Sequence, residues 1–442
     1  MCFAMPLFSY SQLNKFDLSS YKLPDILTRK LDFQFDFNGS QSRSNYWNDS
    51  TSSKKRNSIL NGDFNLSYEQ FRNSEKYQGS LKTDFSLVAQ NSWRYEEDTT
   101  IRNNIDPTLN FQTINRFYKD NKHFYELSLI FNTGRSSYTY TKGYHTKVDA
   151  NFLMGMGRIE PIEDARLAVY ILQDLLENGK LLRTPNSDEV LRIAEKISEL
   201  KKKRFFDHRN RKIYELRSMD SLFKGMGIIK DNDIGYFTVL NDNWSYSTGP
   251  ARWSGSRLSA GIKISEDITF YKYGMSEIEN NFWKRYITTP TFGPMFQARW
   301  DKPINLHWQR KISLRSIVYL TSIQMITDAL KEDGQALMTY WDNKFDMGYN
   351  YYPNSRTSLG FIGGFDFESS FNDWDQGFPI EIRPFLNLSV EYYFSSQLRM
   401  NIAVNSRFGY SNLHPSYWHE GLYTGKEDFV YFANGSLLYS IF

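Results

Sequence analysis

The sequence predicts an all-β membrane barrel of about fourteen antiparallel up-and-down strands, interrupted once by an α-helical insert. Three observations lead to this fold class. Aromatic residues are abundant, long stretches alternate between apolar and polar residues, and no apolar run reaches the roughly eighteen residues of a membrane-spanning helix. A chain that spans a membrane without such a run must form a closed barrel, because each backbone polar group then has a partner in a neighbouring strand.

Composition favours strands at a membrane–water boundary. The 442 residues include 30 Tyr, 34 Phe and 10 Trp, and this aromatic share of 17% is about twice that of a typical soluble domain. Aromatic side chains favour strands and collect where a membrane meets water. The net charge is only +3 at pH 7, so we expect no nucleic-acid partner. The one cysteine, Cys2, excludes an internal disulfide and a cysteine-based metal centre.

The first part of the barrel is predicted over residues 30–158. Apolar residues recur there at every second position, and a period of two gives a strand one apolar and one polar face. The clearest stretches are Leu31–Phe37, Gly62–Tyr68 and Leu81–Leu87. These segments extend to about ten residues or more, the length of a tilted membrane strand. A soluble β-sandwich shows the same alternation, but in shorter strands and with a second sheet.

A helical insert is predicted over residues 159–249, because the apolar period changes to 3.6 from about Glu160. One apolar stripe runs from Leu167 to Leu176. A second helix begins at Asn186 with Glu189 three residues later, which is the spacing of a capping box. The apolar stripes are narrow. We therefore expect the helices to pack on the barrel mouth or on another protein rather than around a large core of their own.

Strand alternation resumes near Arg252 and predicts the remaining strands over residues 250–442. The clearest stretches are Leu258–Ile264, Trp308–Leu320, Ile382–Tyr392 and Leu398–Val404. The connections along the whole chain alternate between short and long. Short turns are predicted at 73–76, 120–122, 301–305, 352–355 and 395–397. Long loops are predicted at 39–57, 93–107, 266–288, 321–335, 369–379 and 410–427.

The alternating strands and the terminal Phe442 resemble integral outer-membrane β-barrel proteins of Gram-negative bacteria. The last strand of that family usually ends in an aromatic residue with apolar residues at alternate positions before it, whereas Ser436 occupies that phase here. The resemblance covers residues 30–158 and 250–442. The stretch from Gly157 to Ala168, which opens the helical insert, is also similar to uncharacterised barrels from Bacteroidota.

The resemblance implies a place for each part of the chain. Short turns of such barrels face the periplasm, and long loops face outward. We therefore expect a barrel embedded in the lipid of the cell outer membrane, with the insert 159–249 on the periplasmic side. Residues 30–158 then hold the first six strands and 250–442 hold strands seven to fourteen. Residues 1–11 are expected to be a signal-peptide remnant, and 12–29 a periplasmic N-terminal segment.

The polar face of the strands is predicted to line the lumen. The lumen-lining candidates are Asp36, Asp63, Lys82, Arg116, Arg257, Arg299, Arg315, Asp342, Asp366, Arg383, Glu391 and Arg407. Acids and bases nearly balance, so the sequence indicates no ion preference. Two interpretations stay open. The charges line a water-filled pore, or they close the lumen with salt bridges, since about fourteen strands falls between filled and open barrels.

The sequence contains no motif of a known catalytic site. A nucleophile elbow, a zinc-protease helix motif, a paired-cysteine motif and a phosphate-binding loop are all missing. Serines and histidines occur without a spacing that singles out a pair. We therefore predict that the chain is not an enzyme, binds no cofactor and holds no metal ion.

Two classes of function remain. The first is a porin-like barrel, a gated or narrow channel for small polar solutes. The second is a structural or accessory subunit that docks protein partners in an outer-membrane complex through the periplasmic insert. The insert favours the second class, but an insert that closes the mouth as a plug or lid is an alternative to docking. Channel activity of the intact chain distinguishes the two classes.

Overall fold

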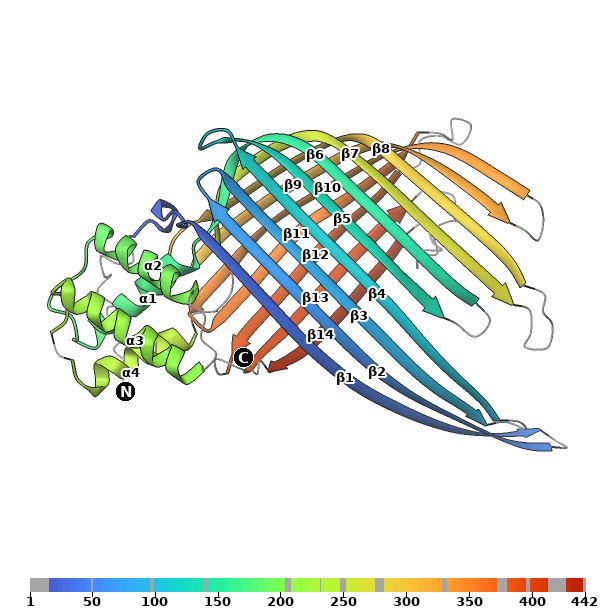
Figure 1. The fold of residues 1–442 in the computed structure, drawn as a ribbon, viewed down its shortest axis with the longest axis horizontal. Coiled ribbons are helices and arrows are strands. Elements are labelled where there is room, and N and C mark those ends of the chain that lie inside the picture. The colour runs from blue at the N-terminus through green and yellow to red at the C-terminus, as the bar shows by residue number, and fades with distance from the viewer. Residues whose placement is uncertain are drawn as a thin grey trace.

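A long, curved antiparallel sheet forms most of the molecule, with a group of helices beyond one of its ends (Figure 1). The computed structural model describes residues 16–48, 51–95, 99–137, 141–202, 208–230, 232–246, 252–274, 282–327, 332–371, 380–394, 398–411 and 427–439. The predicted signal remnant at 1–11, the terminal Phe442 and the side chain of Asp36 lie outside what is described.

The sheet contains fourteen strands in chain order. Before the helices come β1 (Ile26–Asn48), β2 (Thr51–Ser74), β3 (Tyr77–Tyr95), β4 (Thr99–Tyr118), β5 (His123–Ser137) and β6 (Thr141–Pro161). After them come β7 (Trp253–Gly274), β8 (Phe282–Pro303), β9 (Trp308–Thr327), β10 (Glu332–Asn354), β11 (Thr357–Ser370), β12 (Ile380–Tyr393), β13 (Leu398–Ser411) and β14 (Glu427–Tyr439).

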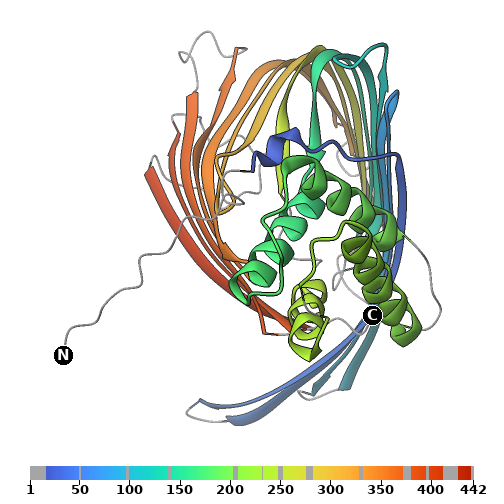
Figure 2. The ribbon, with the colours of Figure 1, turned by 90° about the vertical axis from the view of Figure 1, so that its left-hand side faces the viewer.

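Each strand pairs antiparallel with the next one along the chain, as the alternation predicts. This is the up-and-down topology of a simple barrel. Seen from the helix end, the strands curve around a common centre (Figure 2). The described ladder runs from β1 to β14 and includes no pairing between those two strands. Closure of the barrel therefore stays a prediction.

Several of the predicted long loops are strands instead. β3 and β4 stay paired to Tyr95 and Thr99, through most of the region 93–107. β7 and β8 pair as far as Gly274 and Phe282, through most of 266–288. β1 with β2 and β9 with β10 extend in the same way through 39–57 and 321–335. The prediction of loops fails there because polar residues interrupt the alternation of apolar and polar residues. The hydrogen bonds between two strands that are already paired can continue without an apolar face.

The short turns predicted at 73–76, 120–122, 301–305 and 352–355 form close to those positions, at the helix end of the sheet, and the one predicted at 395–397 lies outside the described residues. Between β4 and β5, the carboxylate of Asp120 accepts hydrogen bonds from the backbone N–H groups of Lys122 and His123. The same hydrogen bonds, with one from the His123 ring, lower the pKa of Asp120. This side-chain-to-backbone arrangement is how aspartate stabilises a tight turn.

Four helices lie between β6 and β7. They are α1 (Glu163–Glu177), α2 (Ser187–Lys202), α3 (His208–Gly225) and α4 (Ile234–Ser245). The predicted capping box is confirmed at the start of α2. The Asn186 side chain accepts a hydrogen bond from the N–H of Glu189 at 2.9 Å, and the Glu189 carboxylate accepts one from the N–H of Asn186 at 2.9 Å.

The insert has a core of its own, which corrects the expectation of narrow apolar stripes. Apolar residues from all four helices are buried together with the N-terminal segment and one turn of the sheet, among them Leu18, Tyr21, Ile171, Leu175, Ile193, Ile197, Phe223, Tyr236, Leu240 and Leu306. The expectation fails because residues 16–25 and Leu306, which are distant in sequence, complete the core. The insert is therefore a packed domain anchored to the sheet.

Candidate functional site

The two faces of the sheet differ sharply in exposure. Phe152 is 47% exposed, whereas the next residue, Leu153, is 3% exposed. Phe296 and Met295 show the same contrast at 36% and 7%. Side chains on the convex face of a curved sheet spread apart, while those on the concave face crowd together. Phe152 and Phe296 therefore mark the convex face, and Leu153 and Met295 mark the concave face.

The convex face is apolar. Large exposed hydrophobic residues follow one another at alternate positions on nearly every strand, for example Leu127, Phe152, Met154, Leu258, Ile262, Phe292, Phe296, Val318, Leu320, Phe361, Leu386, Leu388, Ile402 and Val404. Soluble monomers seldom expose a continuous apolar surface of this kind. An apolar band on the outside of antiparallel strands is what a lipid bilayer requires.

The concave face carries the residues predicted to line a lumen. Most of the candidates occupy the strand phase opposite to the exposed apolar residues, as Arg116 does beside Phe117, and Asp342 beside Trp341. Asp36 pairs with Asp63 in the register of β1 and β2. Glu391 accepts a hydrogen bond from the Tyr393 hydroxyl at 3.3 Å. Whether this face encloses a lumen depends on closure of the sheet.

Ion pairs connect many of these charges across β9 to β13. Arg315 lies 3.2 Å from Asp342, and Lys344 lies 3.5 Å from Asp366, which also pairs with Arg407. We call these five residues the ion-pair ladder. Its members are partly exposed, with 18% to 45% of each side chain open. Exposed pairs of this kind add little stability, so the ladder mainly orders the charges along the wall.

Three further ion pairs add to the same wall. Arg383 lies 3.0 Å from Glu368 and 2.8 Å from Glu381. Lys311 lies 4.0 Å from Asp346, and Asp346 also accepts a hydrogen bond from the Ser313 hydroxyl at 2.6 Å. Most charged groups on this wall are thus held by an opposite charge.

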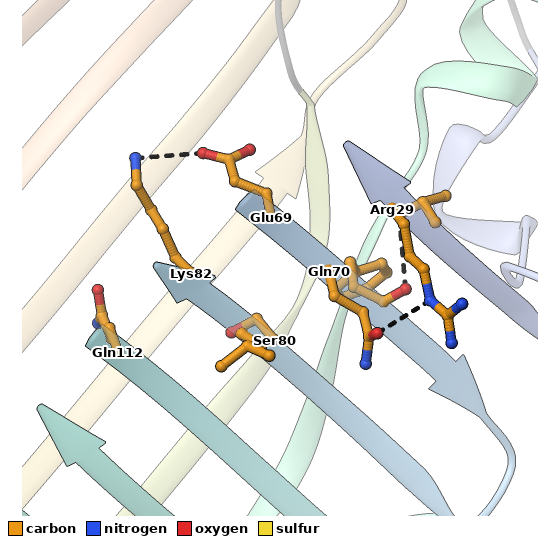
Figure 3. Close-up of a pocket in the computed structure, with 9 residues that line it drawn as sticks. Arg29, Glu69, Gln70, Ser80, Lys82 and Gln112 are labelled. Carbon is orange, nitrogen blue, oxygen red and sulfur yellow. Dashed lines mark hydrogen bonds and ion pairs between the residues drawn. The ribbon is translucent and has the colours of Figure 1, made fainter. Parts of the chain in front are cut away.

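The wall formed by β1 to β4 has an open recess of about 430 Å³. Figure 3 shows Lys82 and Glu69 reaching toward each other from neighbouring strands, with Gln112 on the next strand. The Lys82 amino group lies 3.1 Å from Glu69 and 3.6 Å from Asp84. The lining of this recess includes two cations, Arg29 and Lys82, and one carboxylate, Glu69. Arg29 donates a hydrogen bond to the Gln70 side chain, and Lys82 is paired with Glu69.

A second recess, of about 220 Å³, lies on the wall formed by β7 to β10. We call it the basic recess. Its lining side chains are Arg257, Arg299, Arg315 and Lys344, together with Gln297, Ser313 and Asp346. Three of the predicted lumen-lining residues, Arg257, Arg299 and Arg315, therefore meet in one place with Lys344. The sequence did not indicate this, because the three come from different strands.

The apolar residues Leu153, Met295 and Ile317 form a small buried cluster on the concave face, with Tyr319 packed against it. They extend from β6, β8 and β9. The cluster can form because β7, which lies between β6 and β8, carries Gly261 at this level. The three side chains are at most 7% exposed, so neighbouring side chains cover the cluster.

The insert is anchored to the turns of the sheet through Arg252. This side chain is fully buried, and its guanidinium donates to the carbonyl oxygens of Leu306 and Asn305 at 2.5 and 2.9 Å. It also donates to Trp308 O at 3.1 Å and lies 4.8 Å from the centre of the Tyr352 ring. Burial, with repulsion from a neighbouring arginine, lowers the pKa of Arg252 to about 10.

A second anchor joins α4 to the turn between β10 and β11. Arg356 donates two hydrogen bonds to the Asp242 carboxylate, at 2.7 and 2.6 Å. Its guanidinium also lies 4.2 Å from the centre of the Tyr246 ring. With these anchors in place, the helices lie across the end of the curved sheet (Figure 2). Neither anchor could be found from the sequence, because the partners are distant and show no recurrent spacing.

No group of His, Cys, Asp and Glu residues suited to hold a metal ion occurs within the described part of the chain. Among the described helices, none is both long enough and apolar enough to cross a membrane.

Solved structures similar to this chain are outer-membrane β-barrels. The translocator domain of the autotransporter NalP from Neisseria meningitidis shares 7% identity at a TM-score of 0.28, over 94% of this chain and 88% of that one. A loop L8 deletion mutant of OmpT, an outer membrane protein of Vibrio cholerae, shares 9% identity at a TM-score of 0.27, over 93% and 99%. The TodX ΔS2S3 mutant monoaromatic hydrocarbon channel shares 9% identity at a TM-score of 0.26, over 88% and 87%.

No protein-family model and no curated protein matches the sequence. Because the TM-scores are low, we assign no residue role and no activity from the similar structures.

The prediction that the chain is not an enzyme is corrected. It relied on missing sequence motifs alone, and the comparisons do not uphold it. An active site needs only a few side chains placed on a scaffold, and the fold itself does not decide whether they are present. The exclusion of catalysis is therefore withdrawn.

Proposed function

We propose that this chain forms an outer-membrane β-barrel channel for small polar solutes. One observation supports the proposal above all others. The same strands carry exposed apolar side chains on the convex face and charged side chains on the concave face. A sheet with this division places its apolar face against lipid and its polar face against water.

The proposal includes an orientation. Both anchors attach the insert to short turns of the sheet. Short turns of such barrels face the periplasm. We therefore propose that the insert is periplasmic and that the long hairpins, such as β1 with β2, project outward. Kinship with barrels of Bacteroidota stays a prediction that rests on the stretch from Gly157 to Ala168.

The channel is proposed to be narrow and partly covered. The ion-pair ladder and the cluster around Leu153 project from the concave face, and the anchored insert lies across one end of the sheet. Folded as described, the insert would restrict the periplasmic mouth. Movement of the insert would then act as a gate.

Planar-bilayer recordings test this function. Pro161 and Trp253 lie opposite each other in the register of β6 and β7, so a short turn can replace residues 162–252 without breaking the ladder. We expect stable single-channel steps from the intact chain and larger steps from the deletion variant. A matched variant, Arg192→Ala on the exposed surface of α2, should conduct like the intact chain. Absence of conductance in all three proteins, each shown to be folded, would contradict the proposal.

The alternative is an accessory subunit that docks a protein through the insert. It is favoured by two exposed apolar residues, Leu182 at 63% and Ile234 at 86%. Under this alternative no form of the chain conducts, and a stoichiometric outer-membrane partner is lost when both residues are changed to serine. The channel proposal requires that the intact chain conducts and that no stoichiometric partner is lost when both residues are changed to serine.

A further inference from the structure

The basic recess contains two pairs of like charges placed directly opposite each other on neighbouring strands. Arg257 of β7 is the register partner of Arg299 on β8. Arg315 of β9 is the register partner of Lys344 on β10. Like charges in directly opposite positions destabilise a strand pair. Two such pairs beside one recess therefore call for a compensating negative charge.

Nearby carboxylates supply only part of that charge. Arg299 lies 2.6 Å from Asp301, Arg315 pairs with Asp342, and Lys344 pairs with Asp366. Asp366 is shared with Arg407. Each of these pairs engages a cation from one side and leaves further N–H donors of its guanidinium or ammonium group available.

Arg257 differs from the other three cations. It forms no ion pair or hydrogen bond with any described residue, although it lines the recess beside Arg299. The one carboxylate in the lining, Asp346, already accepts from Ser313 and lies near Lys311. The recess thus has four cations and a single acid among its lining residues. The charge of Glu126 also acts on Arg257, but Glu126 is already paired with Arg116 at 2.6 Å.

We propose that the basic recess binds a phosphate group, either as inorganic phosphate or as the phosphomonoester of a small solute. Guanidinium groups donate in a planar fork that matches two oxygens of a phosphate. The volume of about 220 Å³ accommodates one such group. Gln297 and Ser313 add neutral donors to the same lining. The proposal deepens the channel function, because it makes this recess a binding station for anionic solutes on the concave wall.

Calorimetry on the folded, detergent-solubilised full chain tests the site without relying on conduction. Inorganic phosphate is titrated at constant ionic strength, with chloride as the competing anion. We expect saturable binding to the intact chain. The Arg257→Gln variant should bind at least about tenfold more weakly, since a charged hydrogen bond is worth roughly 1.5–3 kcal/mol.

Two variants keep the result interpretable. Arg257→Lys retains the charge but not the fork, so its affinity should fall between those of the intact chain and Arg257→Gln. Lys82→Gln removes a cation from the other recess, on the wall formed by β1 to β4, and this variant should bind phosphate like the intact chain. Folding of every variant is checked by its heat-dependent shift on gels.

The proposal is overturned if the intact chain shows no saturable binding, or if Arg257→Gln and Lys82→Gln behave alike. A solute that carries only a sugar group should give no heat, because the recess selects the phosphate group. Bilayer recordings separate this inference from the channel function. If the chain conducts but does not bind phosphate, only the proposal of a phosphate site is wrong. If it binds phosphate but does not conduct, only the proposed channel function is wrong.

Discussion

Arg252 shows how one side chain joins two parts of the molecule. Its guanidinium provides donors to three carbonyl oxygens of the turn between β8 and β9 and to the Gln309 side chain. Buried backbone oxygens must find such partners, and a charged donor satisfies several at once. Tyr352 covers the guanidinium on its flat face. The insert and the turn are therefore held by one buried group.

Replacing Arg252 with leucine should weaken the attachment of the insert. The change removes every donor to these carbonyl oxygens, and breaking a buried charged network costs roughly 3 kcal/mol or more. Limited proteolysis should cut the insert of Arg252→Leu faster than that of the intact chain. Arg192→Leu, which alters an exposed arginine of α2, is the control and should change stability by less than about 0.5 kcal/mol. Equal cleavage of both variants would show that Arg252 is not an anchor.

The position of a single residue can be predicted from the sequence only where it belongs to a repeating pattern. The charges on the concave face follow the period of two, and this period is what predicts the strand phase of Arg257 and Asp366. It does not identify the basic recess, because the strand registers that bring Arg257 beside Arg299 leave no sequence signal. Arg252 was missed for a similar reason. Its partners are backbone atoms far along the chain.

At the scale of an element, Gly261 explains how the sheet bends between β6 and β8. A side-chain carbon added at this position would lie 1.9 Å from the carbonyl oxygen of Phe152. The missing side chain lets Leu153 and Met295 meet in front of β7. Glycine inside a strand often marks such a close approach.

Gly261→Ala should destabilise the sheet, because the backbone of β6 must move to relieve the contact. Overpacking of this kind costs roughly 1–3 kcal/mol. The midpoint of urea unfolding, read as loss of the heat-dependent gel shift, should fall. Gly363→Ala is a matched control, since the nearest atom to the added carbon lies 3.8 Å away. The account of the bend is wrong if the two variants unfold together.

Helix α2 depends on the capping box at its start. Glu189 accepts hydrogen bonds from Arg183 as well as from the N–H of Asn186. The hydrogen bond from Arg183, with smaller contributions from the cap and nearby arginines, lowers the pKa of Glu189 to about 2. The capping box was predictable because its two residues are close in sequence. Arg183 was not identified in advance.

The lowered pKa makes the helix sensitive to acid in a defined window. An acid whose folded pKa is depressed stabilises the fold fully above its unfolded value of 4.5, and this contribution disappears as the pH falls through about 2. Hydrogen exchange of the α2 amides, corrected for the intrinsic effect of pH, should therefore accelerate across that window. Glu189→Gln should flatten this part of the profile. The exposed Glu195→Gln on the same helix should leave it unchanged.

At the scale of the whole molecule, the period of two predicts antiparallel strands in chain order, and the change to 3.6 predicts the helices between β6 and β7. The lengths of the loops are not predictable in the same way. The pairing of β3 and β4 continues to Tyr95 and Thr99, through a region where the sequence predicts a loop. The core of the insert also escapes a local pattern, because residues 16–25 and Leu306 complete it. Closure between β1 and β14 stays a prediction, because pairing of the first and last strands leaves no local signal in the sequence.

The base of the insert has a consequence for the entropy of the chain. The N–H of Ile162 donates to the carbonyl oxygen of Arg252 at 3.0 Å, so residues 162–252 begin and end at one point beside Pro161 and Trp253. Closing a flexible loop of that length would cost on the order of 3 kcal/mol more than closing a four-residue turn. The packed core of the insert offsets this cost by holding the two ends together. The whole helical domain therefore connects β6 to β7 as closely as a tight turn connects the two strands of an ordinary hairpin.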